Sequence, residues 1–395
     1  MPDLNEISSH EIGRRLRLAR EIAGIRQETA AQVIGVSRPT LVSIEKGARR
    51  VRIHEIRRLA HHYGTSVNAL LRREAVHTDL VPRFRKLWQA ADDQTAEAVQ
   101  LLNRLVKAEV ELENILGISR RIAYPPERGI NSGDVNELAE LHASELRRWL
   151  GIGNGPVVDV FGMIELDLGI RLYQRRLSSQ SRVAGLFAYD AAVGACILLN
   201  ANHPLRRRIQ SAVHELGHFI GTRQAPEVLE DTERFLSREE RYASAFGRAF
   251  LTPRQGFKES FRQLTAGAER LTRRHVILLA HRHHISREAC VRRLEELELV
   301  NKGAWAWFEA NGRISDAQEL EVLGAASETR DPAKDESNRP MSHRMSLMAH
   351  AAWKRGLMSE GQLAEMLDLH RVELREVIDQ IETEDRETDD LLKLY

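Results

Sequence analysis

The sequence predicts a mainly α-helical, multidomain protein with one small central sheet. Apolar residues recur every three or four positions from Glu11 to about Leu71, and again from about Leu205 almost to the end, which is typical of amphipathic helices. Between Gly169 and Asn200 the pattern changes to short apolar segments bounded by turns. A chain of 395 residues is longer than one ordinary core supports, so we expect several domains.

Composition excludes several classes of protein. The formal net charge is +1 although 29% of the residues are charged, so affinity for nucleic acid must come from a local basic patch. Cys196 and Cys290 are far apart, which argues against a disulfide scaffold and against a thiolate zinc site. The sequence begins with no basic and apolar leader, and no apolar run is long enough for a membrane span. We therefore expect a soluble protein of the reducing cytoplasm.

The first 71 residues predict four or five short helices separated by turns at Gly24, Gly35 and Gly47. Ser37 is a suitable N-cap for a helix with Pro39 in its first turn. Apolar residues of this region would face inward and polar ones outward, as a recognition helix requires. The inward set is Ala30, Val33, Val36, Leu41 and Ile44, and the outward set is Arg38, Thr40, Ser43 and Lys46. A helical bundle with an ordinary basic surface is the alternative.

Residues 80–116 predict a long amphipathic connector. A helical hairpin packed on its own neighbours and a dimerising coiled coil are equally compatible with the pattern, because no heptad persists for three repeats. Pro125 and Pro126 indicate a domain boundary, and a helix is expected from Val135 to Leu150, ending at Gly151.

Strands are expected at 170–173, 183–189 and 195–200, where the residues are apolar or β-branched between turns. The polar stretch 327–339 predicts a linker. Residues after Met341 then predict a separate small helical unit.

The pentapeptide His214-Glu215-Leu216-Gly217-His218 has the HExxH pattern of a zinc site. Histidines four residues apart lie on one helix face, so both imidazoles can reach one Zn²⁺ ion with Glu215 beside it. Zinc polarises a scissile carbonyl and lowers the pKa of a water molecule, and Glu215 would act as the general base. An exposed helix with solvated side chains is the alternative. The flanking residues favour a buried helix, since they are apolar: Ala212, Val213, Leu216, Phe219 and Ile220.

Such a site needs a third protein ligand and one open position. Acidic residues follow the motif at Glu227, Glu230, Asp231, Glu233, Glu239 and Glu240. We favour Glu240, because it opens a helical stretch to Leu251 whose apolar face would hold the carboxylate towards the metal. Glu239 is the nearest competitor. Five histidines elsewhere are less favoured as ligands, because a lone histidine is usually structural or solvated: His203, His275, His281, His283 and His284.

Residues 131–300 resemble the ImmA/IrrE-type metallopeptidase domain, which processes regulators in bacteria. The resemblance rests on the segments 197–208, 213–218 and 240–253. It implies a zincin-like α+β fold, with His214, His218 and Glu240 as zinc ligands and Glu215 as the catalytic base.

The same resemblance implies that the strand around Cys196 to Leu199 lines the cleft and could bind an extended peptide by strand addition. The sequence departs from the family at two places. Ser244 replaces the usual Asn, and Phe250-Leu251-Thr252-Pro253 replaces the usual Leu-Leu-Met-Pro. Neither departure removes a ligand, although both could alter the fit of a substrate.

Residues 11–71 resemble the Cro/repressor-type (XRE) helix-turn-helix domain. The matching positions are Gln27, Gly35, Ser37, Ile44, Glu45 and Gly47. This resemblance implies that Gln27 and Lys46 contact DNA phosphates, and that Arg38, Pro39, Thr40 and Ser43 contact base edges in the major groove. Pro39 has no side-chain donor or acceptor, so specificity would depend mainly on Arg38.

Arg20 and Glu45 are expected to pair and to brace two helices of this domain. Domains of this kind usually bind an operator as a two-fold dimer, so we expect a homodimer, with residues 80–116 as the candidate dimer surface.

Two C-terminal segments, around 285–297 and 357–369, resemble fragments of winged-helix and helix-turn-helix motifs, and we expect them to pack on other parts of the protein. Acidic residues from Glu382 to Asp390 make the end of the sequence a poor phosphate binder. The expected domain limits are 8–73 (helix-turn-helix), 74–124 (helical connector), 131–300 (metallopeptidase), 301–339 (connector) and 340–395 (helical unit).

The sequence thus predicts a DNA-binding transcriptional regulator fused to a zinc-dependent endopeptidase that cleaves a regulatory protein such as a repressor. Its partners would be a double-stranded DNA operator and a protein substrate. No association with a membrane is expected. The alternative is a transcription factor whose peptidase-like domain senses a ligand or partner without cutting.

Overall fold

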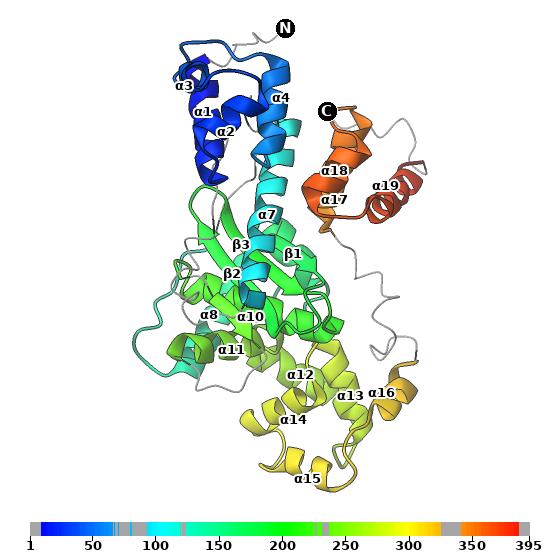
Figure 1. Cartoon of the computed structure of the whole chain (residues 1–395). Coiled ribbons are helices and arrows are strands. Elements are labelled where there is room, and N and C mark those ends of the chain that lie inside the picture. Colours follow the sequence, from blue (N-terminus) through cyan, green and yellow to red (C-terminus); the bar gives the residue numbers. More distant parts are fainter. Residues whose placement is uncertain are drawn as a thin grey trace. The chain divides into compact units, whose positions relative to one another are not determined.

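The computed structural model describes residues 9–65, 67, 70, 80, 93–118, 120, 124–225, 227–230, 237–324 and 341–386. The chain divides into two compact units, Met1–His77 and Thr78–Tyr395 (Figure 1). Among the described residues, no helix has the length and apolar character needed to cross a bilayer. The expected linker at 327–339 lies outside the described residues.

The first unit is all-α, as predicted. Its helices are α1 (Ser9–Ile22), α2 (Gln27–Val33), α3 (Arg38–Glu45) and α4 (Ile53–His62). Leu16, Leu41 and Leu59 are fully buried between them. Ser37 is the N-cap of α3, where its hydroxyl accepts a hydrogen bond from the Thr40 amide at 3.4 Å.

The predicted pair of Arg20 and Glu45 is confirmed. Arg20 Nε lies 2.6 Å from Glu45 Oε1, and Arg20 Nη2 donates to Glu45 Oε2 at 3.2 Å. Gln27 donates to the same carboxylate at 2.9 Å. Both charged groups are buried, so this pairing fixes α1 against α3 and removes an unpaired charge from the core.

The second unit contains a four-stranded sheet in the order β1-β3-β2-β4. Its strands are β1 (Arg171–Arg175), β2 (Val183–Asp190), β3 (Gly194–Asn200) and β4 (Glu227–Glu230). β3 pairs parallel with β1 and antiparallel with β2, and β2 pairs antiparallel with β4. The three expected strands are confirmed, and β4 was not predicted because four residues with a glutamate at each end carry almost no strand pattern.

One face of the sheet is covered by helices α8 (Val135–Leu150), α10 (Leu205–Gly221) and α11 (Arg238–Leu251) (Figure 1). Phe187 of β2 contacts Phe219 of α10, with ring centroids 6.5 Å apart. The limits of α8 are those predicted, because Asp134 caps its first turn and Gly151 ends it in a left-handed conformation.

Further short elements complete this side of the second unit. They are α9 (Val160–Gly162), the π-helix η2 (Met163–Asp167), α12 (Arg254–Leu264), α13 (Arg273–Arg282), α14 (Arg287–Glu296), α15 (Ala304–Ala310) and α16 (Asp316–Leu323). They extend the same hydrophobic core away from the sheet.

The opposite face of the sheet packs against α7 (Asp93–Leu116). The helices α17 (His343–Lys354) and α18 (Glu360–Leu367) pack on α7, and α19 (Arg371–Arg386) packs on α17 and α18. Leu102, Leu105 and Val106 of α7 are fully buried in this core. The apolar face of α7 is therefore covered by its own chain, so the coiled-coil interpretation of this helix is wrong and it offers no such surface to a second copy. Apolar residues of α17, α18 and α19 belong to the same hydrophobic core as α7.

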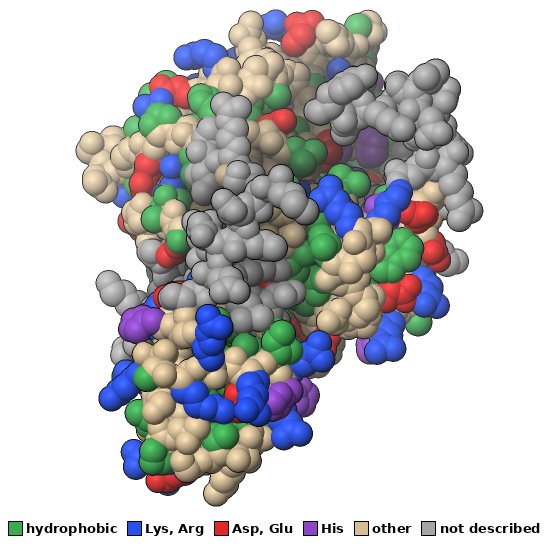
Figure 2. Space-filling model, turned by 90° about the horizontal axis from the view of Figure 1, so that it is seen from above, with side chains coloured by type: hydrophobic (Ala, Val, Ile, Leu, Met, Phe, Trp, Pro, Cys, Tyr) green, Lys and Arg blue, Asp and Glu red, His purple; other side chains and the backbone are tan. Residues whose placement is uncertain are grey.

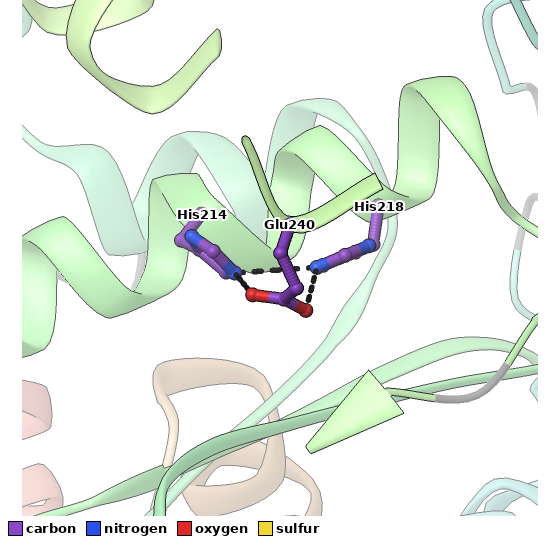
Figure 3. A group of neighbouring side chains, drawn as sticks. All are labelled: His214, His218 and Glu240. Atoms are coloured by element: carbon purple, nitrogen blue, oxygen red, sulfur yellow. Dashed lines mark hydrogen bonds and ion pairs between the residues drawn. The ribbon is translucent and has the colours of Figure 1, made fainter. Parts of the chain in front are cut away.

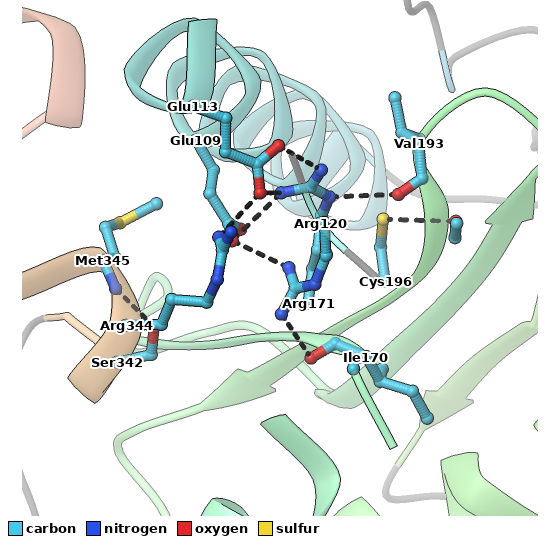
Figure 4. A network of polar contacts seen from close by, with 12 residues as sticks. Glu109, Glu113, Arg120, Ile170, Arg171, Val193, Cys196, Ser342, Arg344 and Met345 are labelled. Carbon is cyan, nitrogen blue, oxygen red and sulfur yellow. Dashed lines mark hydrogen bonds and ion pairs between the residues drawn. The ribbon is translucent and has the colours of Figure 1, made fainter. Parts of the chain in front are cut away.

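A buried ionic network joins α7, β1 and α17 (Figure 4). Arg120 lies 2.7 Å from Glu109, Arg171 of β1 lies 2.8 Å from Glu113, and Arg344 of α17 lies 2.6 Å from Glu113. Burial raises the pKa of the Glu109 carboxyl, but the nearby arginines lower it further, so it stays below its ordinary value. Removing one partner from such a network generally costs about 3–5 kcal/mol, because it leaves a buried charge uncompensated.

Candidate metal centre

The HExxH segment lies in the middle of α10 and is buried. His214 is 6% exposed, Glu215 0% and His218 1%, so the alternative of an exposed helix with solvated side chains is wrong. Val213, Leu216 and Phe219 fill the core on the opposite side of the helix. This packing holds the two imidazoles and the carboxylate on one fixed face of α10.

Helix α11 brings Glu240 to the two histidines. Ser237 caps α11 by accepting a hydrogen bond from the Glu240 amide at 3.2 Å, which fixes the backbone of Glu240 in the first turn. Glu240 Oε2 lies 3.2 Å from His214 Nε2, and Glu240 Oε1 lies 3.2 Å from His218 Nε2 (Figure 3). The two Nε2 atoms are themselves 3.2 Å apart.

These distances between ligand atoms fit a zinc ion. In a tetrahedral site with bonds of about 2.0–2.1 Å, neighbouring ligand atoms are about 3.3 Å apart. Two imidazoles and a carboxylate are also a donor set that zinc accepts in sites that keep one position open. Among the described residues, His214, His218 and Glu240 form the one group of three or more such side chains close enough to hold a metal ion.

The second ring nitrogen of each histidine contacts a hydroxyl group. His218 Nδ1 lies 3.1 Å from Thr222 Oγ1, and the Thr222 hydroxyl donates to the His218 carbonyl. His214 Nδ1 lies 3.3 Å from Ser244 Oγ. A hydroxyl that accepts from Nδ1–H leaves the lone pair of Nε2 for a metal, and such partners orient ligands in metal sites. Thr222 could have been found from the sequence, since it is one helical turn beyond His218.

Glu215 lies beneath strand β2. A Cβ atom added at Gly185 would come within 2.6 Å of Glu215 Oε1, so the strand passes directly over the carboxylate. No local sequence pattern predicts this contact, because Gly185 lies within an otherwise apolar strand.

The expectation that β3 binds an extended peptide by strand addition is wrong. β3 is an interior strand that pairs with β1 on one side and with β2 on the other. Strand addition needs unpaired backbone groups at a sheet edge. In the described sheet the outer strand next to β2 is β4.

Two glycines allow α10 and α11 to approach closely. A Cβ atom at Gly217 would lie 2.7 Å from the Cα atom of Ala243, and one at Gly247 would lie 3.1 Å from Val213 Cγ2. Gly217 lies between the two histidines in sequence, and Ala243 is one turn after Glu240. This close crossing therefore sets the distance between the histidine pair and the carboxylate.

Electrostatics hold Glu240 in its charged form. Burial raises the pKa of the Glu240 carboxyl, but hydrogen bonds to His214 and His218 outweigh burial and lower it to about 2. Burial lowers the pKa of His218, with Glu240 opposing this shift. An ionised carboxylate beside a neutral imidazole is the protonation state that a metal ion requires of such ligands.

The other candidates considered from the sequence do not join this group. Glu239 bonds to Ser237 instead. His283 is buried between the carbonyl of Leu251 at 2.9 Å and the hydroxyl of Ser260 at 3.1 Å, and burial lowers its pKa to about 4. The side chains of the four remaining acidic candidates lie outside the described residues.

The residues expected to contact DNA lie along α3, with Lys46 just after its end and Gln27 at the start of α2. Arg38, Pro39 and Lys46 are exposed. The Ser43 hydroxyl donates to the carbonyl of Pro39 at 3.0 Å, and the Thr40 hydroxyl lies 2.9 Å from that of Ser37. Gln27 lies within 3.4 Å of Arg38. On the face drawn in Figure 2, basic side chains (blue) lie among acidic ones (red), in keeping with a net charge of only +1.

Comparison with known proteins agrees with this division. Residues 11–73 match the family described as a helix-turn-helix domain, and residues 166–295 match the family described as the IrrE N-terminal-like domain, a peptidase family. The chain therefore combines an N-terminal helix-turn-helix domain with a central IrrE N-terminal-like domain.

No curated protein matches the chain. Among solved structures, the crystal structure of ComR from Streptococcus suis is 13% identical and covers 96% of each chain, with a TM-score of 0.16.

Proposed function

We propose that the protein is a DNA-binding regulator whose central domain is a zinc-dependent endopeptidase acting on a regulatory protein such as a repressor. The convergence of His214, His218 and Glu240, with Glu215 on the same helix face, is the observation that carries this proposal. The helix-turn-helix domain supports a role in transcription and makes a digestive enzyme of broad specificity a poor match.

Different side chains of α10 and α11 would bind the metal ion, transfer the proton and orient the imidazoles. His214, His218 and Glu240 would hold the zinc ion, which when bound supplies Lewis acidity that polarises a peptide carbonyl. Glu215 would take the proton from the attacking water and deliver it to the leaving amine. Thr222 and Ser244 would keep the imidazoles in the orientation that presents Nε2.

An extended substrate would pair with the outer strand β4. β4 lies next to β2, and Gly185 of β2 is the residue over Glu215. A peptide added to this edge would run parallel to the sheet near the carboxylate and would be recognised largely through its backbone.

A second candidate function is a transcription factor that senses a partner without cutting. The observation that favours it is the complete burial of Glu215, since a general base must reach its substrate. We rank it second because the full set of ligand and base residues is present.

Removal of metal separates the two functions. We expect the zinc-loaded protein to cleave a candidate repressor, as seen on a gel. Chelation should abolish cleavage and added zinc should restore it. Cleavage that continues after chelation would contradict the peptidase proposal. The same proposal would fail if no candidate protein is cleaved and a partner changes the affinity of the protein for its operator.

For the DNA-binding domain we propose that a homodimer binds an operator, with Gln27 and Lys46 at phosphates and Arg38, Pro39, Thr40 and Ser43 at base edges. Loss of a good bidentate arginine contact costs about 1–3 kcal/mol of discrimination. Arg38→Ala should therefore weaken binding to an operator selected from random DNA by about 5- to 150-fold, measured by fluorescence anisotropy.

The control is Arg17→Ala, because Arg17 is equally exposed but pairs with Glu21 on α1. Its effect should be small. If Arg38→Ala weakened operator and scrambled DNA by the same factor, Arg38 would be a phosphate contact and not a base contact.

A further inference from the structure

A pocket opens on the side of α11 that faces the start of α8. It has a volume of about 370 Å³, and its lining includes Arg238, Arg241, Arg248 and Ser244 of α11 together with Asn136 of α8. Three guanidinium groups thus converge on one small space. Arginine is the side chain that proteins use most for binding carboxylates and phosphates, because its planar group donates several hydrogen bonds in a fixed geometry.

The pocket has little negative charge to balance these arginines. Asp134 lines it, but its carboxylate accepts hydrogen bonds from the amides of Asn136 and Glu137 at the start of α8. Glu296 lies 3.5 Å from Arg248 Nε. Arg241 makes no hydrogen bond or ion pair with any described residue, and its side chain is exposed.

Arg238 is already held in place. Its Nε donates to the carbonyl of Ile130 at 2.5 Å, and its Nη2 donates to the carbonyl of Gly133 at 2.7 Å. Arg248 donates to the side-chain oxygen of Asn136 at 3.2 Å. A ligand would therefore meet side chains whose conformations are partly fixed, which lowers the entropic cost of binding.

Ser244 connects this pocket with the candidate metal centre. Its side chain is exposed in the pocket, and its hydroxyl oxygen lies 3.3 Å from His214 Nδ1. When Nδ1–H donates to this oxygen, the serine proton is available to an acceptor in the pocket. A chain of hydrogen bonds would then run from the bound anion through Ser244 to His214, and such chains strengthen each member.

The position of the pocket favours a small effector over the peptide substrate. Glu240 and His218 lie on the Nε2 side of His214, whereas Ser244 lies on its Nδ1 side. A peptide bound over Glu215 and the Nε2 atoms would not pass through the pocket.

We propose that this pocket, lined by Arg238, Arg241 and Arg248, binds a small oxyanion, the phosphate or carboxylate group of a free metabolite. The bound oxyanion changes the zinc affinity of the metal centre through Ser244 and His214. Binding itself does not depend on the proposed peptidase function, whereas the tuning rests on it.

Binding can be measured by isothermal titration calorimetry on the full chain, with potassium sulfate and sodium succinate as the two probes and potassium chloride at matched ionic strength as the reference. Tighter binding of sulfate would assign a phosphorylated ligand, and tighter binding of succinate a carboxylate. The double variant Arg241→Gln/Arg248→Gln should weaken binding about tenfold or more. The control is Arg262→Gln, since Arg262 is exposed on α12 and does not line the pocket. The proposal would be overturned if the double variant gave the same binding heats as wild type. It would also be overturned if chloride gave the same heats as sulfate and succinate.

Tuning can be measured by zinc competition with a chromophoric chelator, with and without sulfate. Wild type should change its zinc affinity severalfold on adding sulfate, whereas Ser244→Ala, which lacks the hydroxyl between the anion and His214, should show no change at a sulfate concentration that saturates its own pocket. If sulfate binds and zinc affinity never responds in wild type, the tuning is wrong. If zinc does not bind at all, the proposed peptidase function fails. Calorimetry still shows in that case whether the pocket binds an oxyanion.

Discussion

Replacing Glu215 with glutamine is expected to lower the rate of peptide hydrolysis by roughly 10²–10⁴-fold, the usual contribution of a positioned general base. Glutamine has nearly the same size, so it should fit the fully buried position without disturbing α10. The three ligand atoms are unchanged, and zinc should remain bound in a one-to-one ratio. Initial cleavage rates and metal content measured on the same preparation test both parts.

The matched control for this variant is Glu239→Gln, which removes a carboxylate close to Glu240 in sequence but outside the group around the two histidines. We expect its rate to stay within a few-fold of wild type. Equal rates for Glu215→Gln and wild type would show that another group moves the proton. Loss of zinc from Glu215→Gln would show that Glu215 is needed to build the site.

Gly217→Ala should damage the metal centre through packing alone. The new Cβ atom would lie 2.7 Å from the Cα atom of Ala243, which is backbone and cannot rotate away. Overpacking of this kind costs about 1–3 kcal/mol, which exceeds the gain of about 1 kcal/mol in helix propensity at its upper end. Because α11 must move outward, Glu240 should leave the histidines, and zinc affinity should fall roughly 10- to 100-fold.

Gly361→Ala is the control, since Gly361 is also helical but its added Cβ would approach only the end of the Arg371 side chain, at 3.0 Å. This variant should be as stable as wild type or slightly more stable in urea denaturation. Unchanged zinc affinity in a folded Gly217→Ala protein would mean that the helix crossing does not set the position of Glu240.

Much of the fold followed from local sequence patterns. The helix from Val135 to Leu150 is predicted at its observed limits because residues typical of helix caps flank it, Asp134 before it and Gly151 after it. Three strands were found from their apolar runs. Strand β4 was missed, because it is defined by pairing with β2 and not by its own four residues.

The candidate site was predictable where spacing along one helix decides geometry, and less so where tertiary contacts do. His214 and His218 face the same way by helical periodicity alone, and Glu240 was one of six acidic candidates until the crossing of α10 and α11 brought it within 3.2 Å of both. The contacts of Gly185 with Glu215 and of Ser244 with His214 join segments about 30 residues apart, and no local pattern encodes them. For the same reason, the sequence pattern of α7 could not predict that it packs against the sheet and the C-terminal helices.

The contact between α17 and α7 also has a consequence for biosynthesis. Arg344 and Glu109 are 235 residues apart in sequence, yet they lie 3.0 Å apart in the buried network. A ribosome that adds about 5–20 residues per second would need roughly 10–50 s to make the intervening chain. During that time the apolar face of α7 would lack the helices that cover it in the finished protein. The nascent chain would therefore have a long interval in which that face is open to chaperones or to aggregation.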